Sequence, residues 1–457
     1  MDARRKNKMI MVGEIFFNVL GMGLLFLLIW FIFYRYNLMT TFLYKKGTAV
    51  LIFIYCVIYL VFNQIYSGYK IGYLRSSEII YSQCLSMLFV NVITFLQICL
   101  IDRRIVDVHP MVILSVIDVA FISVWTIWSK RRYKKRSIIR NLTVIYRDKE
   151  PWDAADKINH YENKFNVTGF VKCENNIDEI LEDLNKNNGV VLCGIDPLMR
   201  KRIMDFCFEN SMPIFVVPDS SDIILKSATV LSMQDMPLFQ CHRGELSMID
   251  EAIKRLFDVC ASLIGIIVLS PVMLLSALAV KLYDGGPVLY KQDRLTIRGE
   301  VFKVYKFRSM VVDAEKDGVA RLAQAGDSRI TPVGMVMRRY RIDELPQLFN
   351  ILKGDISVVG PRPERPEISK QYEKTMPEFK YRLKMKAGLT GYAQVLGRYN
   401  TTPYDKLMWD LMYIESYSFM MDLKIILMTI KILFVPESTQ GIDSGLLTAE
   451  KTKEVGR

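Results

Sequence analysis

The chain has 457 residues, of which 51% are hydrophobic, and its formal net charge is +12 at pH 7. A mean hydropathy of +0.18 over this length excludes a single soluble domain and predicts a membrane protein with two or three domains. The charge favours anionic lipids and phosphates as partners, and no nucleic-acid-binding motif accompanies it, so binding of nucleic acid is not expected.

Four apolar segments in the first part of the chain each approach or exceed the roughly 20 residues that span a bilayer. They cover residues 9–34, 47–66, 78–101 and 108–129. We therefore predict a four-helix transmembrane bundle in a domain of residues 1–137. Basic residues precede the first segment, lie between the second and third, and follow the fourth, which places both ends of this domain in the cytosol. The first segment lacks a small-residue cleavage site, so we expect it to be retained.

Two acidic residues, Glu14 and Asp118, lie inside these apolar segments. A charged group is costly in lipid, so one interpretation is a functional site. The other is a polar contact inside the bundle that holds helices together, and we favour it because the chemical motifs lie elsewhere. Asn18, Gln83, Asn91 and His109 are the candidate partners.

Residues 138–248 alternate short β-branched runs with polar segments of helical character, which predicts a Rossmann-like α/β middle domain. Helices are expected near residues 153–163 and 177–187, between strands around LTVIY, NVTGF, VVLCG and PIFVVP. The first strand is followed by RDKEPWDAA, without the glycines that let a pyrophosphate approach a helix. Nucleotide binding is therefore not expected here, and a scaffold is the preferred interpretation.

A fifth apolar stretch, from Leu256 to Leu282, is interrupted in the middle by Ser270 and Pro271. Proline removes a helical hydrogen bond and clashes with the preceding turn, so this dipeptide predicts a break in the helix. Basic residues flank both ends of the stretch, which favours a re-entrant helix hairpin over residues 254–282 that enters and leaves through the cytosolic face. The alternative is a spanning helix, which would put the rest of the chain outside the cell.

Residues 338 to 366 read RRYRIDELPQLFNILKGDISVVGPRPERP, with the acidic pair Asp343 and Glu344 among several arginines. Two carboxylates beside cations suit a site that holds a metal-bound diphosphate during displacement at phosphorus. On a helix, adjacent side chains would point about 100° apart, so distinct roles are expected. The alternative is that the two acids merely complement the N-terminus of a helix that tolerates Pro346 in its first turn.

The flanks of the acidic pair favour the phosphate site. Arg338 precedes it, and a stiff glycine-proline turn with Arg362 follows, suited to bidentate phosphate contacts. In KVYKFRSM, the residues Lys306 and Arg308 are candidates for substrate binding. An amphipathic strand with a wet basic face is the alternative for that segment, and both interpretations stay open.

Near the C-terminus, the apolar segment FMMDLKIILMTIKILF is short for a membrane span. An interfacial helix is expected, with lysine stems reaching the lipid headgroups. It ends the predicted catalytic domain, residues 249–435, which we expect to be mainly α-helical. Residues 436–457 are predicted to form a polar C-terminal tail.

The segments KVYKFRSM, DELPQLFN, VGPRPERPE and AGLTGYAQVLGR are similar, in this order, to motifs of the bacterial sugar transferase family of polyprenyl-phosphate sugar phosphotransferases. The resemblance covers roughly residues 250 to 435. It implies transfer of a sugar 1-phosphate from a UDP-sugar to undecaprenyl phosphate, with release of UMP. It also implies that Asp343 is the nucleophile, that Glu344 supports metal or proton chemistry, and that Mg²⁺ is the cofactor held by these two acids. Arg338, Arg362 and Arg398 match the anion-binding positions of the family.

The arrangement of the whole chain resembles long members of this family that transfer a hexose such as glucose or galactose. Such proteins start capsule or exopolysaccharide synthesis in the bacterial inner membrane, with the catalytic domain in the cytosol, and a homodimer is expected from the resemblance alone. A mild departure is the presence of Arg341 and Ile342 before the acidic pair. Two alternative functions remain: a membrane glycosyltransferase that releases UDP, and a non-catalytic membrane scaffold or regulator.

Overall fold

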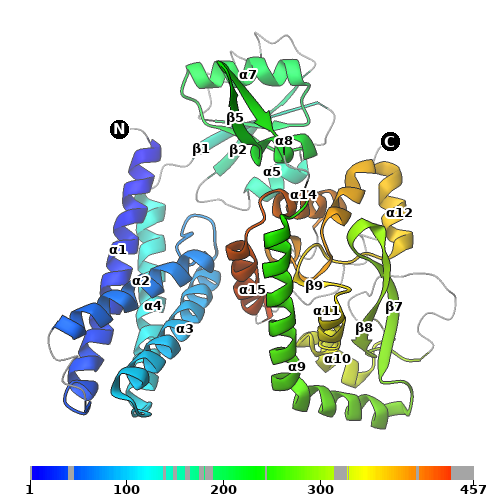
Figure 1. Ribbon diagram of the computed structural model, residues 1–457. Helices are drawn as coiled ribbons and strands as arrows, with labels where there is room; N and C mark the ends of the chain where they lie inside the picture. Colours follow the sequence, from blue (N-terminus) through cyan, green and yellow to red (C-terminus); the bar gives the residue numbers. More distant parts are fainter. Residues whose placement is uncertain are drawn as a thin grey trace. The chain divides into compact units, whose positions relative to one another are not determined.

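The structure is a computed structural model that divides into two compact units, Met1–Val217 and Pro218–Arg457. Figure 1 colours the first unit from blue to green and the second from green to red. The described residues are 3–39, 46–136, 140–147, 152–159, 165–173, 180, 189–241, 244–312, 327, 329–397 and 401–433. The predicted polar tail, residues 436–457, lies outside them.

The first unit begins with four long helices that cover the four predicted apolar segments. They are α1 (Ala3–Ile29), which continues into the π-helical turn η1 (Trp30–Tyr34), α2 (Lys46–Ile65), α3 (Ser76–Asp102) and α4 (His109–Arg136). Among the described residues, five helices have the length and the apolar composition needed to cross a bilayer: these four and α9 of the second unit. The prediction of a membrane protein is therefore confirmed.

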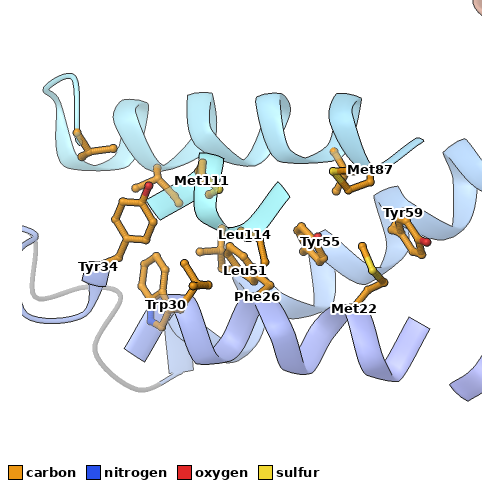
Figure 2. Packing of buried hydrophobic residues seen from close by; sticks show 14 of the residues in the cluster. Met22, Phe26, Trp30, Tyr34, Leu51, Tyr55, Tyr59, Met87, Met111 and Leu114 are labelled. Carbon is orange, nitrogen blue, oxygen red and sulfur yellow. The ribbon is translucent and has the colours of Figure 1, made fainter. Parts of the chain in front are cut away.

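The four helices share one apolar core that is rich in aromatic rings. Figure 2 shows Phe26 of α1 against Tyr55 of α2, with Trp30 and Leu114 nearby. The rings of Phe26 and Tyr55 are stacked, with centroids 4.6 Å apart. Many apolar side chains on the outer faces of these helices, such as Phe53, are exposed, as a lipid-facing surface requires.

Polar contacts link the same helices. The amide of Asn91 on α3 donates to Asp118 on α4 at 3.2 Å and accepts from the Tyr55 hydroxyl of α2 at 3.1 Å. The contact between Asp118 and Asn91 confirms one of the predicted pairings. Glu14 instead lies 3.3 Å from Arg132 of α4, so its partner differs from those predicted. A second group of hydrogen bonds joins Tyr69, Asn18 and Gln83.

The first unit ends with a parallel sheet in the strand order β2-β1-β3-β4, as the sequence predicts. Its strands are β1 (Arg140–Tyr146), β2 (Phe165–Lys172), β3 (Val190–Cys193) and β4 (Ile214–Val216), with helices α5 (Trp152–Asn159) and α7 (Pro197–Glu209). The central strand β3 is fully buried, which explains its continuous run of apolar residues. The helix predicted over 177–187 lies outside the described residues except for Ile180.

The second unit opens with the short helix α8 (Ser220–Lys226) and a hairpin of β5 (Thr229–Met233) and β6 (Met236–Gln240). The long helix α9 (Met248–Asp284) follows and contains Pro271. Figure 1 shows α9 bending into two legs. The Ser270 hydroxyl donates to the Ile267 carbonyl at 2.8 Å, which is the carbonyl that the missing N–H of Pro271 leaves free. The helix nevertheless continues through Ser270 and Pro271, and the re-entrant hairpin stays a prediction.

Short elements follow α9 in the chain. They are β7 (Leu289–Leu295), η3 (Ile297–Gly299), β8 (Val301–Phe307), α10 (Pro332–Arg339), η4 (Ile342–Glu344), α11 (Gln347–Lys353), β9 (Ser357–Val359), α12 (Pro366–Thr375), η5 (Pro377–Lys384), β10 (Gly388–Thr390), α13 (Tyr392–Leu396), α14 (Pro403–Glu415) and α15 (Phe419–Leu433). Among them, β8, α10, α11, β9 and α15 pack against α9. β7 pairs antiparallel with β8, and β9 pairs parallel with β10. Asp258 of α9 accepts hydrogen bonds from the Ser357 hydroxyl and the Val358 N–H, and so joins the helix to β9.

A buried ion pair fastens α9 to α15. Lys254 lies 2.5 Å from Asp422, whose other carboxylate oxygen accepts a hydrogen bond from the Tyr413 hydroxyl at 2.6 Å. Both charged side chains are almost fully buried. An Asp422→Leu variant is expected to lose about 3–5 kcal/mol of stability, because it leaves the buried Lys254 charge without its counter-ion. Denaturant unfolding of the purified protein in detergent measures this loss.

The control is the double variant Lys254→Met and Asp422→Leu, which removes both charges. We expect it to recover most of the stability, because replacing a whole buried pair with apolar groups is often neutral. Equal losses in the single and double variants would contradict this interpretation of the pair.

Candidate active site

The acidic pair lies in a single 3₁₀ turn, η4, between α10 and α11. Arg341, just before the turn, has φ 54°, a left-handed conformation that is uncommon for a residue other than glycine. Pro346 is the N-cap of α11, so the chain reverses within a few residues on either side of the pair. In a 3₁₀ turn, adjacent side chains point about 120° apart, which gives Asp343 and Glu344 different surroundings.

Glu344 is surrounded by cations from three segments. Its carboxylate lies 2.8 Å from the Lys306 ammonium, 3.2 Å from the Arg362 guanidinium and 3.8 Å from Arg341. Burial by itself raises the pKa of Glu344, but the three cations outweigh it and hold the pKa well below its usual range. Glu344 is therefore ionised at neutral pH, and its partners are side-chain cations rather than the N-terminus of α11.

Asp343 has a different environment. Its side chain is 8% exposed, and burial, with the charge of Glu344 added, raises its pKa to about 6 against the attraction of Lys306 and Arg338. Within the described part of the chain, its carboxylate takes part in no side-chain hydrogen bond or ion pair. The surroundings thus shift the pKa values of the two acids in opposite directions. Glu344 is held in an ion-pair network, whereas Asp343 is available for chemistry.

Arg338 and Lys306 come from two different elements that precede the pair in the chain. Arg338, near the end of α10, donates from Nε to the Ser309 hydroxyl at 2.8 Å, and its charge acts on Asp343. Lys306 comes from β8 and is mostly buried against Glu344. The structure therefore brings together five of the predicted residues: Asp343, Glu344, Lys306, Arg338 and Arg362.

Arg308 is engaged elsewhere. Its guanidinium forms a bidentate pair with Asp284 at the end of α9, and its Nε donates to the Pro287 carbonyl at 2.8 Å. These contacts fix the connection from α9 into β7 and leave the side chain 7% exposed. Substrate binding by Arg308 remains a prediction, and its described contacts are structural. Arg398 lies outside the described residues.

Mg²⁺ was predicted between Asp343 and Glu344. Both side chains supply hard oxygen donors, and Mg²⁺ is usually held by one or two carboxylates together with substrate phosphates. No cluster of three or more Asp, Glu, His or Cys side chains occurs among the residues that the structure describes. Two carboxylates are enough for an ion whose coordination a diphosphate completes, and Mg²⁺ at this pair stays a prediction.

Several residues of this region had no recognisable signal in the sequence. Arg341 was noted only as a departure from the family pattern, yet its backbone and charge both shape the turn. Ser309, Asp284 and two further arginines, Arg294 and Arg382, contact site residues through tertiary structure alone. Their spacing along the chain follows no local period.

Comparisons with known proteins identify the family of the region that contains this site. The family described as "Bacterial sugar transferase" matches residues 249–436. A UDP-N-acetylgalactosamine-undecaprenyl-phosphate N-acetylgalactosaminephosphotransferase of Aeromonas hydrophila is 37% identical over 236 residues, which are 50% of this chain and 54% of the relative. A UDP-glucose:undecaprenyl-phosphate glucose-1-phosphate transferase of Escherichia coli is 33% identical over 264 residues, 56% of this chain and 57% of the relative.

A third relative is covered more fully. The UDP-glucose:undecaprenyl-phosphate glucose-1-phosphate transferase of Caulobacter vibrioides is 40% identical over 190 residues, which are 40% of this chain and 71% of the relative. The chain spans little more than half the length of the first two relatives. All three names include undecaprenyl phosphate, and two of them name glucose while one names N-acetylgalactosamine.

Proposed function

Because the chain belongs to the bacterial sugar transferase family, we propose that it transfers a sugar 1-phosphate from a UDP-sugar to undecaprenyl phosphate. The products are UMP and a lipid-diphosphate-linked sugar, which starts a capsule or exopolysaccharide repeat. The observation that carries the proposal is the split environment of the acidic pair: Glu344 is neutralised by three cations, while Asp343 makes no side-chain hydrogen bond or ion pair with the residues that the structure describes.

The proposed chemistry consists of two displacements at one phosphorus atom. A carboxylate oxygen of Asp343 attacks the phosphorus that bears the sugar, and the bond from that phosphorus to the bridging oxygen breaks, so UMP leaves with that oxygen. An oxygen of undecaprenyl phosphate then attacks the same phosphorus and displaces Asp343, which regains its carboxylate. The number of phosphoric anhydride bonds is unchanged, so no further energy source is required.

The surrounding cations would lower the charge repulsion between these anions. Arg338 and Arg362 lie on different sides of the pair and are suited to phosphate oxygens, since a guanidinium can make two parallel hydrogen bonds. Mg²⁺, when bound, supplies charge neutralisation on the diphosphate. Glu344 keeps Lys306 and Arg362 in place before substrate arrives, which reduces reorganisation during the reaction.

The test is nucleotide release by the purified protein in nanodiscs with undecaprenyl phosphate and Mg²⁺. UDP-glucose, UDP-galactose and UDP-N-acetylgalactosamine are supplied separately, because the relatives differ in their sugar. Lipid-dependent release of UMP supports the proposal, and the best donor identifies the sugar, for which we propose a hexose. Release of UDP favours the glycosyltransferase alternative. No release with any donor favours the scaffold.

The proposed reaction places the catalytic unit in the cytosol, with α9 entering and leaving the membrane on one face. A Tyr290→Cys variant, in which the exposed Cys241 and Cys260 are replaced by serine, is expected to resist a membrane-impermeant thiol reagent in intact cells. It should react after permeabilisation. A Leu38→Cys variant in the loop after the first helix is the control and should be labelled from outside. Labelling of residue 290 from outside would mean that α9 spans the bilayer.

A further inference from the structure

The loop of residues 361–364, called here the Arg362 loop, is fixed by hydrogen bonds to all four of its carbonyl groups. Pro361 and Pro363 have no N–H, so the loop cannot form regular secondary structure and its carbonyls need other donors. Each of the four carbonyls from residue 361 to residue 364 accepts a hydrogen bond. The donors are Gly388 N–H to Pro361, Arg382 Nη2 to Arg362, Arg294 Nη1 to Pro363 and Leu295 N–H to Glu364, at 2.9 to 3.1 Å. Two of the four donors are arginine side chains.

Arg382 is itself rigidly held. Its Nε donates to Asp410 at 2.6 Å, and the two side chains are 5% and 1% exposed. The guanidinium also lies over the ring of Phe379, 4.8 Å from its centroid. One edge of the planar group is therefore fixed by a buried carboxylate while the other reaches the Arg362 carbonyl, which is a geometry that lysine cannot reproduce.

Arg294 donates to the next carbonyl of the loop, that of Pro363. Its second amino group, Nη2, donates to the Gln292 side-chain oxygen at 2.6 Å, so a neighbouring residue of β7 orients the guanidinium. Burial, together with the nearby charges of Arg362 and Arg365, lowers the pKa of Arg294 to about 10, so it remains a cation at neutral pH. A partly buried cation among other cations is costly, and donation to the loop offsets part of that cost.

We propose that Arg382, oriented by Asp410, and Arg294 are positioning residues that fix the backbone of the Arg362 loop and so aim the Arg362 guanidinium at Glu344. This inference rests on the proposed function, because Arg362 acts there on the substrate phosphates. The Arg362 side chain is 43% exposed and makes a 3.2 Å contact with Glu344. A long exposed side chain keeps such a contact only if its backbone is fixed, since rotamer freedom opposes it.

The experiment measures UMP release, with kcat and KM for the UDP-sugar, in an Arg382→Lys variant. Lysine keeps the positive charge but cannot donate to Asp410 and to the Arg362 carbonyl in the same geometry. We expect kcat/KM to fall by about 10²-fold, which is the scale of a displacement of about 1 Å in a phosphate-binding group. Arg298→Lys is the matched control, because Arg298 is exposed on the turn after β7, and it should behave as wild type.

A double-variant comparison separates positioning from general stability. In an Arg362→Met background, Arg382→Lys is expected to cause less than about a threefold further loss, because the group that it positions is already absent. An equal loss in both backgrounds would overturn the inference, and so would wild-type kinetics of Arg382→Lys. Arg294→Lys is expected to give the same pattern with a smaller loss.

Hydrogen exchange supplies a readout that does not depend on activity. In Arg382→Lys, peptides that cover residues 357–364 and 386–391 should exchange faster, since the Gly388 N–H donates to the same loop. Unchanged exchange would overturn the inference even if the wild-type protein released no UMP. Faster exchange in an inactive wild-type protein would keep the loop-holding role and refute the proposed function together with the catalytic consequence.

Discussion

An Asp343→Asn variant is expected to release UMP more slowly than wild type by a factor on the order of 10⁴, the scale seen when a nucleophile is removed. The amide is close in shape to the carboxylate but cannot form the phosphosugar ester. The side chain is 8% exposed and has no side-chain partner in the described part of the chain, so the change should leave the fold intact. Release of UMP from each UDP-sugar measures the effect.

The control for this variant is Asp293→Asn, an exposed aspartate on β7 that should retain activity. A second measurement sharpens the test: with radiolabelled sugar and no lipid acceptor, wild type should retain acid-stable label on the protein, and Asp343→Asn should not. Substantial UMP release by Asp343→Asn would contradict a covalent role for this residue.

A Glu344→Gln variant is expected to lose activity by a factor on the order of 10²–10³, because it removes the anion that holds Lys306 and Arg362 in place. The variant should also shift the pH dependence of kcat/KM. In the wild-type protein, the rate is expected to rise with pH through about 6 as Asp343 ionises. Removing the neighbouring negative charge lowers the pKa of Asp343, so the rising limb of kcat/KM should move to lower pH.

The same pKa has a consequence for stability. The pKa of Asp343 is raised from 3.8 to about 6 in the folded protein, so folding favours the protonated acid. The stabilising contribution of Asp343 is fully present below pH 3.8 and is lost as the pH rises through 6.

The control for Glu344→Gln is Glu300→Gln at an exposed position, which should change neither the rate nor its pH dependence. A rising limb that stays near pH 6 in Glu344→Gln would show that another group controls the rate.

Features that depend on local sequence were predictable. The four long helices follow from apolar segments of spanning length, and the parallel sheet follows from strands that alternate with helices. The contact of Asp118 with Asn91 was among the expected pairings, whereas α9 continues as a helix through the proline that was expected to break it. In each confirmed case, the physical cause lies within one segment or one pattern.

Features that depend on tertiary pairing were not predictable. KVYKFRSM marks Lys306 and Arg308 equally, yet the first lies against Glu344 and the second against Asp284. Two residues along a strand are enough to separate a site residue from a structural one, and only the path of the chain decides between them. The left-handed backbone conformation of Arg341 likewise could not be predicted from the sequence, because arginine as a residue type does not favour it.

The hydrogen bonds among Tyr55, Asn91 and Asp118, and among Tyr69, Asn18 and Gln83, have a consequence for how the first unit assembles. Lipid tails solvate an apolar helix face as well as another helix does, so apolar contact alone selects neither neighbours nor depth. Each polar side chain has few acceptable partners, and all of them lie at defined heights along another helix. These polar pairs therefore determine which helices become neighbours in the bilayer. They also disfavour a shift of one helix along the membrane normal relative to the next.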